Sequence, residues 1–165
     1  MIVYPDEFLA PREETDEAGV VHRWHERVAG ESWDAGPILL SWADVEASRV
    51  ADGFHVVIHE CAHKLDLGDG AMNGVPDLAG SGVATSEWQR VMSAAWERAG
   101  RDCGARGRTV VDEYALESPE EFFAVLSEHF FTMPAELYRD LPDAAALLAR
   151  FYRLDPRDWN DARAQ

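Results

Sequence analysis

The chain has 165 residues and a mass of 18.4 kDa, a size typical of one domain with a substantial core. Lys and Arg total 15 against 31 Asp and Glu, so the formal net charge is −16. This negative field repels phosphate, which disfavours nucleic acid and anionic membranes as partners. Two cysteines are too few for a disulfide scaffold, and neither a signal peptide nor an apolar run of about 20 residues is visible. We therefore expect a cytoplasmic protein.

The first forty residues favour β-structure. Residues 2–4 are β-formers, residues 19–28 roughly alternate in polarity, and residues 36–42 read as a short apolar strand. The strand at 38–40 is either an edge of a substrate cleft or an ordinary core strand. The acidic stretch 11–19 is predicted to be a solvated loop. His22 and His25 face opposite sides of a strand, so we expect surface residues rather than a metal pair.

Helices are predicted after residue 42. Their expected positions are 44–50, 54–67, 86–99, 118–131 and one or two short segments in the tail. Between the second and third helices, the glycine-rich stretch 68–82 predicts a long loop, a feature that is often functional. Trp88, Trp96 and Trp159 are expected in the core or at its margin. Strands followed by helices predict an α+β fold, and no clean boundary divides residues 1–165, which we expect to form one domain.

The sequence His59-Glu60-Cys61-Ala62-His63 carries the chemistry. Residues i and i+4 lie about 40° apart around a helix, so both imidazoles project from one face and can bind one Zn2+. Glu60 is rotated about 100° from His59, beside the metal, where it can act as a base toward an activated water. A random sequence of this composition contains about 0.02 matches to the pattern. The alternative is a pair of histidines that bind nothing.

A catalytic zinc takes three protein ligands and a water, so a third ligand must come from elsewhere. Asp66 and His55 lie on the same helix, and ligands stacked along one straight helix do not converge on a tetrahedral ion. Asp66 instead fits a supporting role, in which it holds a histidine or caps the following loop. The alternative is a carboxylate of purely local use at the helix end.

The helix predicted after Ser118 is the better source of the third ligand. Ser118, Pro119 and Glu121 match a capping box, so Glu121 has a purely structural reading. However, acidic side chains on so apolar a helix require a partner, and a cation would serve. Spacing alone leaves Glu120, Glu121 and Glu128 open.

Four stretches together resemble a known family. They are residues 3–8, 30–37, 56–66 and 119–131, which include the Val-Tyr-Pro segment, the histidine motif and the Phe-Phe helix. They are similar to the MtfA (Mlc titration factor A) family of bacterial zinc peptidases, a gluzincin group related to the catalytic domain of anthrax lethal factor. The resemblance implies a zincin-like fold with a small mixed or antiparallel sheet, an active-site helix and further helices.

The resemblance also implies roles for individual residues. His59, His63 and the glutamate directly before the Phe-Phe pair, Glu121, would bind Zn2+, with Glu60 as general base. Tyr114, seven residues before Glu121, corresponds to the residue that stabilises the oxyanion in lethal-factor-like sites. The candidates for holding these groups in place are Asp66, Glu128 and Asp112.

The expected activity is hydrolysis of peptide or amide bonds in a peptide or protein substrate, by aminopeptidase or endopeptidase action. Family members usually carry additional chain before the Val-Tyr-Pro segment, so this chain is expected to lack an N-terminal extension. The alternative function is a regulatory module that binds a transcriptional repressor or another protein regulator, with a metal site of little catalytic use. No nucleic acid or membrane partner is expected.

Overall fold

The computed structural model describes residues 1–16, 19–32, 36–48, 53–106 and 111–159. Its strands are β1 (Ile2–Tyr4), β2 (Phe8–Thr15), β3 (Val21–Val28), β4 (Gly30–Ser32) and β5 (Ile38–Ser41). Its helices are α1 (Trp42–Ala47), α2 (Val56–Asp66), α3 (Thr85–Arg106), α4 (Pro119–Thr132), α5 (Pro134–Asp140) and α6 (Pro142–Tyr152), with 3-10 turns η1 (Leu67–Asp69) and η2 (Tyr114–Leu116). The predicted α+β, zincin-like architecture is confirmed.

A small mixed sheet stands next to the motif helix α2. Its order is β1-β5-β4, with β1 parallel and β4 antiparallel to β5. Because β5 is the central strand, the reading of residues 38–40 as an edge of the cleft is wrong, and the core-strand alternative holds. Both β4 and β5 pack against α2, and β4 does so more extensively.

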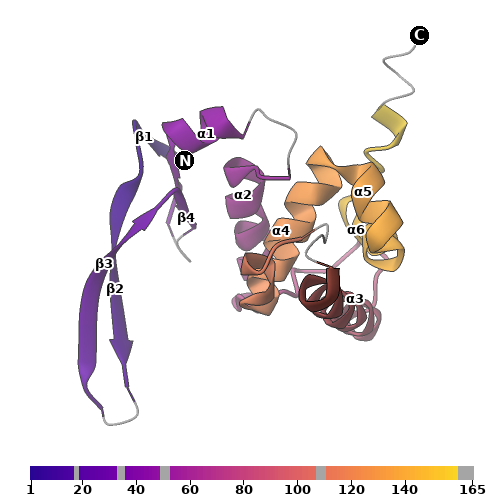
Figure 1. Ribbon diagram of the computed structural model, residues 1–165, viewed down its shortest axis with the longest axis horizontal. Helices are drawn as coiled ribbons and strands as arrows, with labels where there is room; N and C mark the ends of the chain where they lie inside the picture. Colours follow the sequence, from indigo (N-terminus) through magenta and orange to yellow (C-terminus); the bar gives the residue numbers. More distant parts are fainter. Residues whose placement is uncertain (17–18, 33–35, 49–52, 107–110, 160–165) are drawn as a thin grey trace.

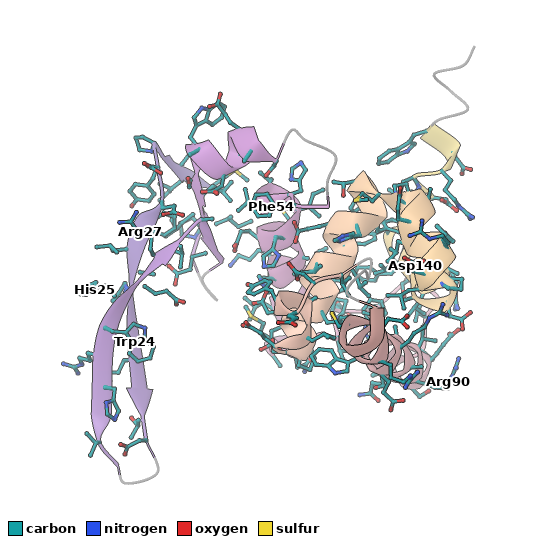
Figure 2. The ribbon with its side chains drawn as sticks, in the orientation of Figure 1. Trp24, His25, Arg27, Phe54, Arg90 and Asp140 are labelled. Carbon is teal, nitrogen blue, oxygen red and sulfur yellow. The ribbon has the colours of Figure 1, made fainter. Side chains whose placement is uncertain are left out.

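Strands β2 and β3 form a long antiparallel hairpin that extends away from the helices (Figure 1). The prediction of a loop over residues 11–19 is therefore wrong for residues 11–15. Acidic side chains and a proline favoured a loop, but pairing across the hairpin outweighs that preference. Glu13 lies directly opposite Arg23 and accepts a hydrogen bond of 2.6 Å from its Nε. Trp24, His25 and Arg27 follow one another along the hairpin (Figure 2), and His22 and His25 are exposed as expected.

The apolar core lies among the helices. Helices α3, α4 and α6 supply most of the largest buried side chains: Trp88, Phe122, Phe123, Leu126, Phe130, Leu147 and Leu148. Trp88 meets Phe123 edge to face, with ring centroids 5.5 Å apart. Trp159 does not belong to this core, because it is 48% exposed and only stacks on Phe131.

Helices α2 and α4 lie side by side, which brings two distant parts of the sequence together. The start of α4 follows the predicted chemistry, since Ser118 is the N-cap, its Oγ accepts from the Glu121 amide, and Pro119 is the first helical residue. Between η1 and α3 the chain has no regular structure over residues 70–84, so the predicted glycine-rich loop is confirmed.

Candidate metal centre

Helix α2 brings the two motif histidines to one point. The Nε2 atoms of His59 and His63 are 3.0 Å apart, and the rings meet nearly at right angles, with an interplanar angle of 83°. His63 is buried, while the side chain of His59 is 12% exposed. The i, i+4 spacing therefore places two imidazole nitrogens together at the side of α2 that faces α4.

Helix α4 supplies a carboxylate to the same point. Glu121 Oε2 is 3.1 Å from His59 Nε2, and Glu121 Oε1 is 3.4 Å from His63 Nε2. Within the described part of the chain, these three residues are the one group of His, Cys, Asp or Glu side chains whose ligand atoms lie close enough to hold a metal ion. Glu120 and Glu128 are outside this group, so the geometry singles out Glu121 among the three glutamates that sequence spacing left open.

The distances fit a tetrahedral metal ion. Zinc bonds to nitrogen or oxygen are about 2.0–2.1 Å long, and two such bonds at a tetrahedral angle put their ligand atoms about 3.3 Å apart. The Nε2 atoms of the two histidines are 3.0 Å apart, and each lies 3.1 or 3.4 Å from one oxygen of the Glu121 carboxylate, so every separation is close to this value. Two histidines and a carboxylate are also a common zinc ligand set that leaves a fourth position open.

Charge arguments indicate that this group attracts a cation. Burial lowers the pKa of His59, but hydrogen bonds to Glu121 and Glu128 and their charges outweigh burial and raise it to about 10. Burial raises the pKa of Glu121, but its contacts with His59, His63 and Tyr114 hold it well below its usual range. In the metal-free protein a proton on His59 therefore compensates the two carboxylates, and a metal ion would replace it.

Glu128 contacts the side of the His59 ring opposite Glu121. Glu128 Oε1 lies 2.8 Å from His59 Nδ1, and a carboxylate can only accept, so Nδ1 carries a hydrogen and Nε2 is the ring nitrogen available to a metal ion. The other oxygen, Oε2, accepts from the backbone N–H of His55, the N-cap residue of α2. Buried Glu128 thus fixes both the ring of His59 and the start of its helix.

Glu60 is buried beside the two histidines, with 6% of its surface exposed. Its Oε2 has no hydrogen-bond partner among the described residues. Burial raises the pKa of Glu60, although the charges of His59 and His63 oppose the shift. Strand β4 approaches this carboxylate so closely that a Cβ on Gly30 would lie 2.5 Å from Glu60 Oε1. A glycine at this position therefore leaves room for Glu60.

Tyr114 lies on the solvent side of the same site. Its ring centroid is 6.0 Å from that of His59, and its hydroxyl hydrogen-bonds Glu121. Burial and then this bond raise the pKa of the phenol above its usual range, so it remains a donor. Asp112 Oδ1 accepts from the Ala115 amide at 3.2 Å and so ties the preceding loop to the short turn η2 that carries Tyr114.

Asp66 ends α2 and is completely buried. Its Oδ2 accepts from the backbone N–H groups of Asn73 and Gly74, at 3.0 and 2.7 Å. Its Oδ1 and His63 Nδ1 are both buried without a hydrogen-bond partner among the described residues. These two bonds are the loop-capping contact that the sequence analysis gave as one of the possible roles of Asp66.

A cavity of about 920 Å3 opens onto the centre. His59, Glu60, Asp112, Tyr114 and Glu128 line it. The other lining residues were not predicted as site residues: residues 26–30, Gly53, Phe54, Val56, Cys103, Val111, Glu113, Val125 and His129. Phe54 precedes α2, where Figure 2 labels it. These residues come from the end of the hairpin, from β4, from loops and from helices α2, α3 and α4, so only the tertiary fold brings them together.

The comparisons with known proteins agree with this geometry. The model of a family described as glucose-regulated metallo-peptidase M90 matches residues 1–153. The chain belongs to this family. It is also similar to the Mlc titration factor A of Yersinia pestis (strain Pestoides F) and of Yersinia pseudotuberculosis serotype O:1b (strain IP 31758). Each is 39% identical over 172 residues, which cover 99% of this chain and 63% of the relative.

Because M90 is a metallopeptidase family, membership in it implies a metal ion. The chain spans 63% of the length of these curated relatives. Their name describes a factor that titrates Mlc, which is a statement about those proteins. Among the described residues, the structure contains no helix with the length and apolar character needed to span a membrane.

Proposed function

We propose that this M90 member is a zinc-dependent peptidase whose single catalytic domain comprises residues 1–165. His59, His63 and Glu121 would hold the zinc, and peptides, proteins or amino-acid amides would be the substrates. The observation that carries the proposal is the convergence of the two histidine Nε2 atoms and the Glu121 carboxylate, with separations of 3.0 to 3.4 Å, although His63 and Glu121 are 58 residues apart in the chain. The enzyme would act in the cytoplasm, without a nucleic acid or membrane partner.

Each remaining residue has a chemical task in this proposal. A zinc ion bound at the three ligands would polarise the substrate carbonyl and lower the pKa of a water molecule toward about 7. Glu60 would take a proton from the attacking water and deliver it to the leaving amine, a task suited to a buried carboxylate with a raised pKa. Tyr114 would donate its hydroxyl hydrogen to the oxygen on which negative charge develops.

The supporting residues keep these groups in place. Glu128 holds His59 in the tautomer that presents Nε2, and Asp112 holds the turn that carries Tyr114. Asp66 secures the loop that follows the motif helix. Because each support is buried or belongs to a cap, the site would be largely preformed before substrate binds.

The decisive experiment separates metal binding from hydrolysis. Glu60→Gln is expected to bind one equivalent of zinc but to lose turnover of a fluorogenic peptide or amino-acid amide. Glu120→Gln is the matched control, since it removes a neighbouring carboxylate outside the metal group, and it should retain both properties. Unchanged turnover in Glu60→Gln would refute the proposed base.

A second experiment addresses the third ligand. Glu121→Ala should lose most of its zinc affinity, measured by competition with a chromophoric chelator, whereas Glu120→Ala should not. Equal zinc affinities for these two variants would contradict the proposed ligand set.

A regulatory binding module is the second candidate function, and the name of the similar titration factors favours it. A metal of purely structural use would usually be closed by a fourth protein ligand, and the described residues form a group of three. A peptidase assay with and without chelator discriminates between the two functions. Hydrolysis that disappears with chelator supports the enzyme, and retained zinc without hydrolysis supports the binding module.

A further inference from the structure

Gly74 lies in the loop between η1 and α3, and its whole backbone is engaged. Its N–H donates to Asp66 Oδ2 at 2.7 Å, and its carbonyl accepts from the indole N–H of Trp88 at 2.8 Å. Its φ is +76°, which an L side chain rarely adopts. Gly74 is buried, so this residue joins the end of α2 to the first turns of α3 inside the protein.

Gly74 also presses against the first residue of α4. A Cβ on Gly74 would lie 2.5 Å from the carbonyl oxygen and 2.7 Å from the carbonyl carbon of Pro119. These are backbone atoms, so no side-chain rotation can relieve the overlap, and the loop and the start of α4 would have to move apart. Glu121 lies two residues further along, with its amide bonded to the N-cap Ser118, and its position depends on that first turn.

The other end of this contact is anchored beside a motif histidine. Asp66 lies three residues after His63 on α2 and is completely buried. Through its Oδ2 it holds Asn73 and Gly74, and Gly74 in turn touches Pro119. A continuous set of contacts therefore runs from the helix that bears the two histidines to the turn that bears the third carboxylate.

We propose that Gly74 is a positioning residue that sets the distance between Glu121 and the two histidines. Its missing side chain lets the loop lie against Pro119, and its hydrogen bond to Asp66 fixes the loop relative to α2. The proposal rests on the proposed role of Glu121 as third ligand. It concerns metal affinity and coordination geometry, which can be measured without any substrate.

The test compares two glycines with the same backbone conformation. Gly74→Ala is the test variant, and Gly82→Ala is its control, because Gly82 has a φ of +74° but nothing within 4 Å of an added Cβ. Both variants carry the backbone strain of a left-handed alanine, and only the first collides with Pro119. Zinc affinity would be measured by chelator competition, and the visible spectrum of bound Co2+ would report the coordination geometry.

We expect Gly74→Ala to bind zinc about 10- to 100-fold more weakly than Gly82→Ala, the range seen when groups that orient metal ligands are removed. Its Co2+ spectrum should also change. In a Glu121→Ala background the difference between the two glycine variants should vanish, because the displaced carboxylate is already gone. Equal affinities in the two glycine variants, or a loss that persists without Glu121, would overturn the proposal.

The same design separates a failure of this inference from a failure of the proposed ligand set. If Glu121→Ala alone leaves zinc affinity unchanged, the ligand set is wrong whatever the glycines do. If Gly74→Ala does not fold, Asp66→Asn takes its place, since it keeps the volume but weakens the bonds to the loop. Its zinc affinity should fall about tenfold, the lower end of the same range, and only where Glu121 is present; an unchanged affinity, or a fall that persists without Glu121, would overturn the proposal.

Discussion

Replacing Gly30 by alanine should disable Glu60 without disturbing the metal ligands. The added methyl carbon would lie 2.5 Å from Glu60 Oε1, 2.7 Å from its Cγ and 2.8 Å from its Cδ. Ordinary contacts between such atoms are about 3.5 Å, so the carboxylate must move by about 1 Å. A displacement of that size can cost about 100-fold in rate, or about 2.7 kcal/mol in the barrier.

The assay measures kcat and KM for a fluorogenic peptide together with the zinc content of Gly30→Ala. We expect kcat to fall about 100-fold with one equivalent of zinc retained. Gly100→Ala is the control for an added methyl group, because nothing lies within 4 Å of a Cβ at this position of α3. In a Glu60→Gln background, Gly30→Ala should cause little further loss, since both changes remove the same function. Full activity in Gly30→Ala would refute the assignment of Glu60 as a base held by β4.

Three further predictions concern Tyr114 and Glu128 at the candidate metal centre and Tyr152 beside the core. Tyr114→Phe should lower kcat about 100-fold or more, because it removes the donor to the oxyanion. Zinc affinity should fall far less, since only one hydrogen bond to Glu121 is lost with the hydroxyl; a loss of activity that full zinc loading reverses would argue against this role. Glu128→Gln should weaken zinc binding about 10- to 100-fold by chelator competition, since one of the two bonds to His59 and the α2 backbone is lost. Burial raises the pKa of Tyr152 to about 12, so the folded state resists its ionisation, and the free energy of unfolding should fall as pH rises from about 10 to 12. Urea titrations at pH 9 and 11.5 should show this loss, and it should be smaller in Tyr152→Phe.

The sequence predicted which side chains of the candidate metal centre come together, because they lie on regular helices. The histidine spacing, the N-cap at Ser118 and the apolar face of the following helix are local patterns with known geometry. Spacing could not choose among the three glutamates of α4, because the rotation of α4 about its axis depends on its packing against α2. The structure places Glu121 at the histidines and turns Glu128 toward the far side of the His59 ring.

Local sequence patterns could not predict the hairpin or the cavity. Residues 11–15 have the composition of a loop, and only the opposite strand makes them extended. Likewise, nothing near Gly30 or Gly74 in the sequence indicates that the first makes room for Glu60 and the second for Pro119. A glycine that permits a close approach carries no pattern of its own, since the reason for it lies in a residue far along the chain.

The separation of the metal centre from the core makes these experiments interpretable. The large buried aromatic and leucine side chains come from α3, α4 and α6, and neither His59 nor His63 belongs to that cluster. In the metal-free protein, a proton and the bonds from Glu128 and Tyr114 already compensate the buried charges of the site. Loss of zinc should therefore remove function before it removes the fold, and a ligand variant that still shows cooperative unfolding can be read as a test of chemistry. Metal-free chain that is unfolded by circular dichroism at neutral pH would contradict this separation.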